Sequence, residues 1–332
     1  MAKKGITRET FKTMIGGQAL IEGIMMLGPE KSAVVVRTKE GLKTKVAPRK
    51  LPKKGFSLKK FPFIRGVFNF CASMAVGVRA LMYSADLSME EEEEPEKQSK
   101  VDKWLEKKLS SDKAQGALVT FAVVLGILFS VGLFIILPSL IGSSLIEPFI
   151  KSTIVRNLVE GAVRIAILIL YMYLVSHMKD MKRVFSYHGA EHKTIRCYEA
   201  RLPLTVENVR KQTRKHPRCG TSFLFVVIII SILVFSVATV ILAPITPTFS
   251  SGIVNALLRV ALKLLLLPIV VGISYEFNRL VGRFDNFLTR FLSAPGLWLQ
   301  NLTTNEPDDS MMEVAIEALT LVLPEEEGAD KW

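Results

Sequence analysis

Cysteine and histidine are scarce in this chain of 332 residues, which contains three cysteines and four histidines. Three cysteines cannot build a disulfide framework, so we expect a reducing compartment. The polar start of the chain is not followed by a short apolar core with a small-residue cleavage site, and we therefore expect no cleavable signal peptide. Because both residue types are rare, any place where they cluster carries information.

Long apolar runs, in contrast, are abundant. Hydrophobic residues make up 49% of the sequence, and the mean hydropathy is +0.33. A helix needs about 20 apolar residues to cross a bilayer core of roughly 30 Å. Four runs are long enough: residues 116–141, 154–176, 223–243 and 253–275. The predicted fold is mainly α-helical, a polytopic membrane protein with about four transmembrane helices in two hairpins, 116–176 and 223–275.

Positive charge is concentrated between the two predicted hairpins. Residues 177–222 form a basic segment, in which positions 177–220 carry eleven Lys or Arg and only four acids. The only charged residues in the links inside the two hairpins are Lys151 and Glu147. The positive-inside rule then places the basic segment and both termini in the cytoplasm. A formal charge of +12 is typical of cytoplasmic loops that face anionic lipid, so the expected partner is the lipid bilayer.

The segments before the first hairpin have a different character. Residues 1–62 are predicted to form a cytoplasmic β-containing segment, because SAVVVRTKEGLKTKV alternates around a Glu-Gly turn like a β-hairpin. Residues 63–86 are apolar but short between Arg65 and Arg79, so we interpret them as an amphipathic helix lying at the membrane interface. If they crossed the membrane, the termini would face opposite sides.

Two polar segments complete the predicted organisation. Residues 87–115, which include an acidic run, are expected to form a charged linker. Residues 276–332 are expected to form a cytoplasmic tail. Within this tail, DDSMMEVAIEALTLVL combines an acidic cap with helical apolar spacing and predicts an amphipathic helix.

The window YHGAEHKTIRCYEA contains two of the four histidines in the pattern His-x-x-Glu-His. On a helix, His188 and His192 lie on one face, and Glu191 is three residues from His188, so all three can face one ion. In inverted zinc hydrolases this spacing supplies two metal ligands and a carboxylate that takes a proton from water. The pattern is short and also arises by chance.

A second cluster, KHPRCGTS, lies at the other end of the basic segment, where His216 and Cys219 stand at metal-ligand spacing. Antiparallel neighbouring helices would bring both ends together at the membrane surface, where Glu276, just after the fourth run, is a further candidate metal ligand. Three ligands and an open position predict a catalytic centre with Glu191 as general base, whereas four His and Cys ligands predict a closed structural one. In the third interpretation there is no metal, and Cys219 is a small buried hydrophobe.

Ionisable residues interrupt two of the apolar runs. The second contains Arg156, Glu160 and Arg164, and the fourth contains Arg259 and Lys263. Such groups are expensive in a membrane and normally face a partner or a wet cavity. They neutralise one another along the helix in the simplest interpretation, but one acid cannot balance four bases. The excess predicts an intramembrane charged groove open to lipid phosphate or to a polar segment of another protein.

Six segments together carry a family resemblance: GGQALIEGIMMLGPEKSAVVVR, FPFIRGVFNF, FSYHGAEHKTIRCYEA, HPRCGTSFLF, GISYEFNRL and NEPDDSMMEVAIEAL. From about Ile15 to Leu321, the chain resembles the bacterial membrane family catalogued as domain of unknown function 1385, often labelled a metal-dependent enzyme. The resemblance implies a bacterial plasma membrane location. It also implies these site residues: His188, Glu191, His192, His216 and Cys219, with Glu22 as a further candidate.

Two functional hypotheses follow. The first is a hydrolase that depends on a divalent metal, with zinc favoured by the mixture of histidine and cysteine, and that acts on a membrane-embedded or lipid-linked substrate. The second is a non-enzymatic membrane scaffold or assembly factor whose basic segment contacts a protein partner, the ribosome or the translocation machinery, without sequence-specific nucleic-acid recognition. A transporter is less favoured, because four helices are few and no inverted repeat is visible.

Overall fold

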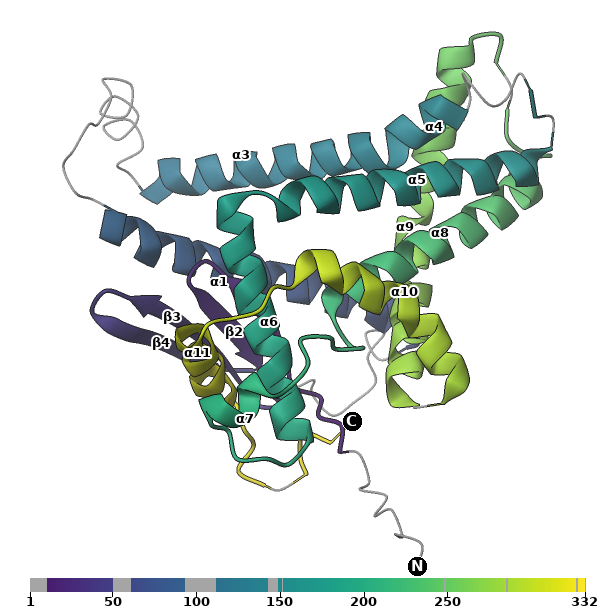
Figure 1. Cartoon of the computed structure of the whole chain (residues 1–332). Coiled ribbons are helices and arrows are strands. Elements are labelled where there is room, and N and C mark those ends of the chain that lie inside the picture. Colours follow the sequence, from purple (N-terminus) through teal and green to yellow (C-terminus); the bar gives the residue numbers. More distant parts are fainter. Residues whose placement is uncertain are drawn as a thin grey trace, which may run out of the picture. The chain divides into compact units, whose positions relative to one another are not determined.

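The computed structural model describes residues 11–49, 61–92, 112–142, 149–150, 152–247, 249–284, 286–326 and 328–331. Long helices dominate, and a small antiparallel sheet lies near the start of the chain (Figure 1). The predicted fold class is therefore confirmed. Most of the predicted charged linker lies outside the described residues, as do Glu147 and Lys151.

The chain divides into two compact units. The first unit comprises Met1–Glu91, Met172–Val226 and Gly272–Trp332, and the second comprises Glu92–Tyr171 and Val227–Val271. The first unit contains the sheet together with the histidine and cysteine clusters. The second contains the charged residues of the second and fourth apolar runs.

The sheet has four antiparallel strands in the order β1-β2-β3-β4. The predicted hairpin is confirmed by the pairing of β3 with β4, which places Thr38 opposite Gly41 at the turn. Gly41 has φ 125°, a backbone conformation that favours glycine. The first two strands were not predicted, because GGQALIEGIMML does not alternate. The strand bounds are β1 Gly16–Leu20, β2 Gly23–Leu27, β3 Lys31–Thr38 and β4 Gly41–Pro48.

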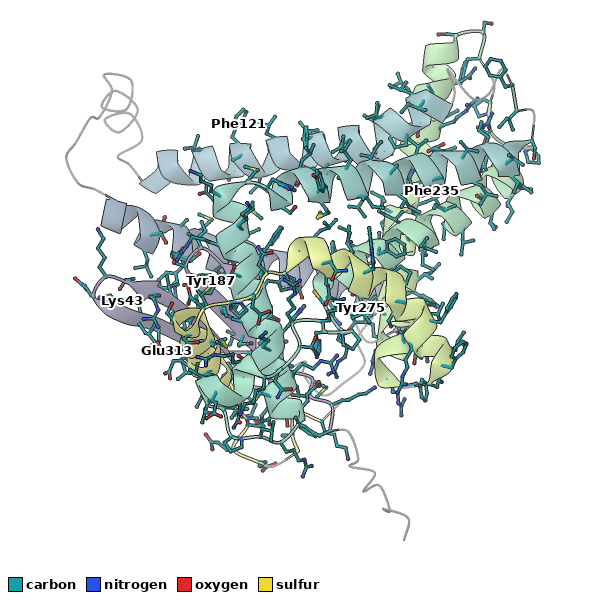
Figure 2. All side chains as sticks on the ribbon, viewed as in Figure 1. Lys43, Phe121, Tyr187, Phe235, Tyr275 and Glu313 are labelled. Atoms are coloured by element: carbon teal, nitrogen blue, oxygen red, sulfur yellow. The ribbon has the colours of Figure 1, made fainter. Side chains whose placement is uncertain are left out.

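Two helices of the first unit, α6 Lys179–Glu199 and α11 Asp309–Thr320, pack on one face of this sheet, and α7 Val206–Arg210 packs against both helices. Their shared core includes Met26, Val35, Tyr187 and Leu319, all fully buried. Figure 2 shows Tyr187 pointing from α6 into this layer. The acidic cap predicted for α11 is present, since the Asp308 carboxylate accepts the Met311 N–H at 2.9 Å. The sequence did not predict α10, Phe287–Thr303.

Five helices among the described residues are long and apolar enough to cross a membrane, judged by length and composition. Four correspond to the predicted runs, and the fifth candidate covers Ile64–Ser88 within α1. The interfacial placement of this segment stays a prediction; α1 extends well beyond its arginines, and Arg65 is paired with Glu276 at 2.6 and 2.5 Å. The bounds are α1 Ile64–Glu92, α3 Asp112–Val131, η2 Gly132–Ile136, α4 Leu137–Ile141, α5 Thr153–Ser176, α8 Gly220–Leu242 and α9 Gly252–Arg283.

Apolar side chains on the outside of these helices are consistent with lipid contact. Phe121, Leu125 and Leu128 of α3 are all more than half exposed. In Figure 2, Phe121 points away from the neighbouring ribbon. Soluble proteins rarely expose apolar surface continuously along a helix, so this surface indicates insertion into a bilayer.

Candidate metal centre

Helix α6 carries the histidine pair. It begins after Met178, with Asp180 in its first turn and Arg196 in its last, charges that suit the two ends of the helix dipole. One helical turn separates His188 from His192, and their ring centroids are 4.4 Å apart. The expectation that both rings share one face therefore holds in this geometry.

Cys219 immediately precedes α8 and meets the histidine pair. Its Sγ lies 3.2 Å from His188 Nε2. One ligand atom each from His188, His192 and Cys219 lie within 4.8 Å of one another, and both His192 and Cys219 are buried. Two imidazoles and a thiol at this spacing match the donor set of a zinc site.

Backbone carbonyls orient both imidazole rings. His188 Nδ1 lies 2.8 Å from the Thr303 carbonyl at the end of α10, and His192 Nδ1 lies 2.6 Å from the Arg214 carbonyl. A carbonyl can only accept, so each Nδ1 carries the proton and donates it. Each Nε2 is then the nitrogen left to bind a cation, the arrangement that orients metal-ligating histidines.

Electrostatics in the group favour an ionised thiol. Burial alone would raise the pKa of Cys219, but His188 and His192 outweigh it and hold that pKa well below its usual value. Burial likewise opposes charge on His188, yet the Cys219 thiolate and Glu191 raise its pKa to about 9. Without a metal, the pair is thus a thiolate beside an imidazolium, and a cation could take the place of the proton between them.

Glu191 lies beside this group and is 5% exposed. Its Oε1 accepts the Gly17 N–H of β1 at 3.1 Å. Burial raises the pKa of Glu191, and the neighbouring histidines partly offset that rise. Gly17 is required for the close approach, because a Cβ at that position would lie 3.0 Å from the Glu191 carboxyl carbon and 2.7 Å from the Met25 carbonyl oxygen.

His216 adjoins the group without being part of it. Its ring centroid is 5.6 Å from that of His192, and its Nε2 lies 3.4 Å from Glu199 Oε2. Burial lowers the pKa of His216 to about 4. Burial opposes ionisation of Glu199 too, but His216 and Arg218 outweigh it and lower that pKa to about 2. The result is a buried neutral imidazole held by a carboxylate.

Two further carboxylates predicted for the site are engaged elsewhere in the first unit. Glu276 forms its paired contact with Arg65. Glu22 lies in the turn between β1 and β2 with φ 50°. Its carboxylate accepts hydrogen bonds from the Arg183 guanidinium and, at 3.3 Å, from the Tyr187 hydroxyl. The structure does not bring either side chain into the group formed by His188, His192 and Cys219.

The charged residues predicted for a groove are gathered in the second unit. The Lys263 ammonium contacts the Glu160 carboxylate and donates to Ser139 Oγ at 2.8 Å. Arg164 donates to the same carboxylate at 3.3 Å. Arg259 lines a cavity beside them.

Sequence reasoning missed several residues that support the centre. The carbonyls of Thr303 and Arg214 carry no side-chain signal, and nothing in GGQAL marks Gly17 as a neighbour of Glu191. Glu199 did carry a signal, because it lies seven residues after His192, two turns further along the same helix face.

Long apolar helices, a small antiparallel sheet and a His-His-Cys group within the sheet-bearing unit define the class of protein. The chain belongs to the family described as "Protein of unknown function (DUF1385)", whose model matches residues 61–325. It is 36% identical over 313 residues to "Uncharacterized protein YqhQ" of Bacillus subtilis (strain 168), covering 93% of this chain and 92% of that protein. No solved structure matches the chain.

Proposed function

We propose that this chain is a zinc-binding protein of the bacterial plasma membrane that hydrolyses a membrane-embedded or lipid-linked substrate at the cytoplasmic face. The observation that carries the proposal is the convergence of the His188, His192 and Cys219 ligand atoms within 4.8 Å. Three protein ligands leave a fourth position for water or substrate, as in catalytic zinc centres. The mixture of imidazole and thiolate favours zinc over harder cations.

The roles of the chain's own residues follow from their contacts. His188 and His192 are oriented by carbonyls and offer Nε2, and Cys219 offers a thiolate. Zinc bound there would act as a Lewis acid and make water a better nucleophile. Glu191 is anchored through Oε1 to the Gly17 amide, which leaves Oε2 to accept a proton. Its raised pKa suits a general base that must later return that proton.

A structural metal centre in a scaffold or assembly factor is the second candidate. It is favoured by the depth of burial, since Glu191 and His192 are 5% and 1% exposed. In that case the metal would stabilise the first unit, and the basic segment 177–222 would contact a ribosome, translocation machinery or another protein.

Metal content is the first measurement. The purified full chain should contain about one zinc per molecule by elemental mass spectrometry, and His188→Ala should lose most of it. His177→Ala is the matched control, because His177 is exposed and contacts the Tyr173 carbonyl at 2.7 Å instead of the group. Equal zinc content in the two variants would overturn the proposed centre.

Hydrolysis is tested without knowing the substrate by incubating the protein with a bacterial membrane extract in heavy-oxygen water. Wild type should place the label in particular lipid or peptide products detected by mass spectrometry. Glu191→Gln should retain zinc and produce no labelled product. Zinc binding without any label that depends on Glu191 would support the structural centre and reject the hydrolase.

A further inference from the structure

Helix α10 of the first unit turns large apolar side chains outward. Phe287, Phe291 and Trp298 are 85%, 68% and 54% exposed. Because they are four and seven residues apart, all three lie on one side of the helix. Helices of soluble proteins turn their apolar stripe toward the core instead. The outward face of α10 therefore suits apolar surroundings better than water.

The opposite side of α10 is polar and is buried in the protein. Gln300 is fully buried, and its Oε1 accepts the His216 N–H at 2.9 Å. Its Nε2 donates to the His216 carbonyl at 2.7 Å and to Ser222 Oγ at 3.0 Å. Thr289 is buried on the same helix. Hydrogen-bonding groups thus lie inside and aromatic rings outside, the reverse of a helix on a soluble protein.

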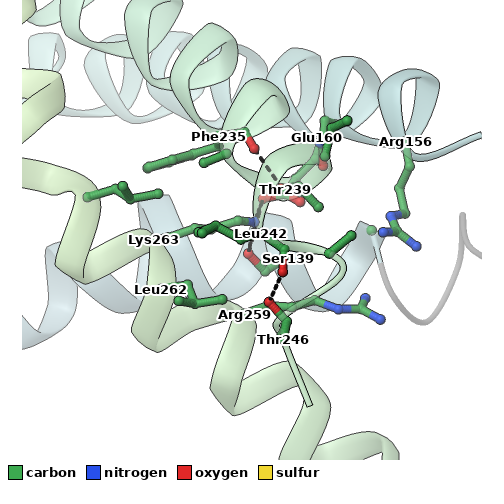
Figure 3. Close-up of a pocket in the computed structure, with 16 residues that line it drawn as sticks. Ser139, Arg156, Glu160, Phe235, Thr239, Leu242, Thr246, Arg259, Leu262 and Lys263 are labelled. Carbon is green, nitrogen blue, oxygen red and sulfur yellow. Dashed lines mark hydrogen bonds and ion pairs between the residues drawn. The ribbon is translucent and has the colours of Figure 1, made fainter. Parts of the chain in front are cut away.

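Helix α5, which is long and apolar enough to cross a membrane, has the same reversed arrangement. Its buried Glu160 contacts Lys263 at the cavity drawn in Figure 3. Leu158, two residues away, is exposed. Two residues correspond to about 200° around a helix, which is also the offset between buried Gln300 and exposed Trp298 in α10. Helix α10 therefore shares the side-chain arrangement of a helix that contacts lipid.

Length and position favour a helix that lies on the bilayer over one that crosses it. The 17 residues of α10 extend about 25 Å, which is shorter than a hydrocarbon core of roughly 30 Å. Helix α9 ends at Arg283, and α10 begins at Phe287. The segment Val254–Arg283 is itself long and apolar enough to cross a membrane. Because a membrane-crossing helix ends at the membrane surface, α10 begins there.

The first turn of α10 is suited to surroundings with little water. Asn286 Oδ1 accepts the Thr289 N–H at 2.9 Å, and Thr289 Oγ1 accepts the Asn286 N–H at 3.0 Å. This reciprocal capping box satisfies two backbone donors at the start of the helix. Backbone donors near lipid need partners within the protein, since water is not there to supply them.

We propose that α10 lies in the plane of the membrane interface, with Phe287, Phe291 and Trp298 inserted where the lipid headgroups meet the acyl chains. Tryptophan is enriched at that depth, because its ring is apolar and its N–H can still reach a polar partner. Through Gln300, the other side of α10 holds the backbone of His216 at the membrane surface. This lipid contact does not depend on metal binding.

The test is tryptophan fluorescence of the full chain reconstituted in phosphatidylcholine vesicles. The chain contains three tryptophans, so Trp104→Phe and Trp332→Phe leave Trp298 as the reporter. Phosphatidylcholine brominated near the headgroup end of its acyl chains should quench the emission at least about twofold, because interfacial helices insert about 5–10 Å. Bromine at the far end of the acyl chains and iodide in the water should each quench it less.

A second reporter and a matched control distinguish lipid contact from local distortion at Trp298. Phe291→Trp combined with Trp298→Phe moves the reporter two turns along the same face and should give the same order of quenching. Glu207→Trp combined with Trp298→Phe places the reporter on α7, where the exposed Glu207 carboxylate lies 2.6 Å from Lys211 Nζ. Iodide should quench this control reporter more than either brominated lipid does.

Three results would overturn the proposal. Stronger quenching of Trp298 by iodide than by the brominated lipids would mean that water covers this face. Weak quenching by every agent would mean that a second copy of the chain or another protein covers it. Strongest quenching by bromine at the far end of the acyl chains would mean that α10 lies in the hydrocarbon core and not at the interface.

Discussion

Replacing Gly17 with alanine tests the contact between the sheet and the candidate metal centre. An added Cβ would lie 2.7 Å from the Met25 carbonyl oxygen, 2.9 Å from Met26 Sδ and 3.0 Å from the Glu191 carboxyl carbon. The Met26 side chain can move aside, but the Met25 carbonyl belongs to the ladder between β1 and β2 and cannot move without loosening it. Overpacking of this kind costs about 1–3 kcal/mol.

Gly16→Ala provides a control within the same strand. Nothing lies within 4 Å of a Cβ added at Gly16. Alanine there also reduces the conformational entropy of the unfolded chain, so that variant should be neutral or more stable by up to about 1 kcal/mol. The two glycines are neighbours with similar local sequence. A difference between their variants therefore reports the contacts of Gly17 alone.

The assay is thermal unfolding of both variants in detergent, and the zinc content of each variant is then measured. Gly17→Ala should lower the unfolding midpoint by several degrees, since 1 kcal/mol corresponds to roughly 2–4 °C in a unit of this size. Because the alanine methyl group also displaces the Glu191 carboxylate, Glu191→Ala should relieve part of the loss and make the two changes non-additive. Equal midpoints for Gly17→Ala and Gly16→Ala would refute the packing described here.

Three other predictions follow from single contacts or pKa shifts. Glu160→Gln removes the charge that balances Lys263 and should destabilise the protein by about 3–5 kcal/mol in chemical denaturation. Asp330→Ala removes the buried acceptor of the Thr13 hydroxyl, at 2.5 Å, and should cost about 1–3 kcal/mol in the same assay. In metal-free protein, the stability contributed by His216 should be lost as the pH falls from 6.5 toward 4, because folding holds its pKa near 4, and the stability contributed by Glu199 should be lost from 4.5 toward 2, because its pKa lies near 2. Unfolding midpoints measured across this pH range check the direction of the change. Glu199→Gln should flatten the pH dependence of the midpoint between pH 4.5 and 2.

Local patterns predicted the parts of the fold that depend on neighbours in sequence. The apolar runs predicted four long helices, alternation predicted the β3–β4 hairpin, and the acidic cap predicted α11. The interfacial placement of residues 63–86 stays a prediction, and Arg65 of helix α1 is paired with Glu276, a residue more than 200 positions away. No local pattern reveals such a partner, so the sequence alone could not show that the charge of Arg65 is paired.

In the candidate site, too, local patterns predicted some contacts, and others depend on residues far away in the sequence. Helical spacing predicted that His188, Glu191 and His192 face one point, and the two ends of the basic segment predicted that Cys219 approaches them. Sequence could not rank the remaining candidates, because His216 and Glu276 have suitable chemistry for a ligand. Their contacts with Glu199 and Arg65 depend on how distant segments pack.

The candidate centre joins four segments that are far apart in the chain, which gives a bound metal mechanical consequences as well as chemical ones. Its candidate ligands come from α6 and from the residue before α8. The carbonyls that orient the histidines belong to Arg214 and to Thr303 at the end of α10, and the amide that anchors Glu191 belongs to β1. A ligand that binds only the folded form stabilises it in proportion to the logarithm of its concentration. Zinc would therefore tie the sheet, α6 and α10 into one cooperative unit, and this holds for a catalytic and for a structural centre alike. Stabilisation by zinc thus cannot distinguish the two roles, whereas the fate of labelled oxygen in Glu191→Gln can.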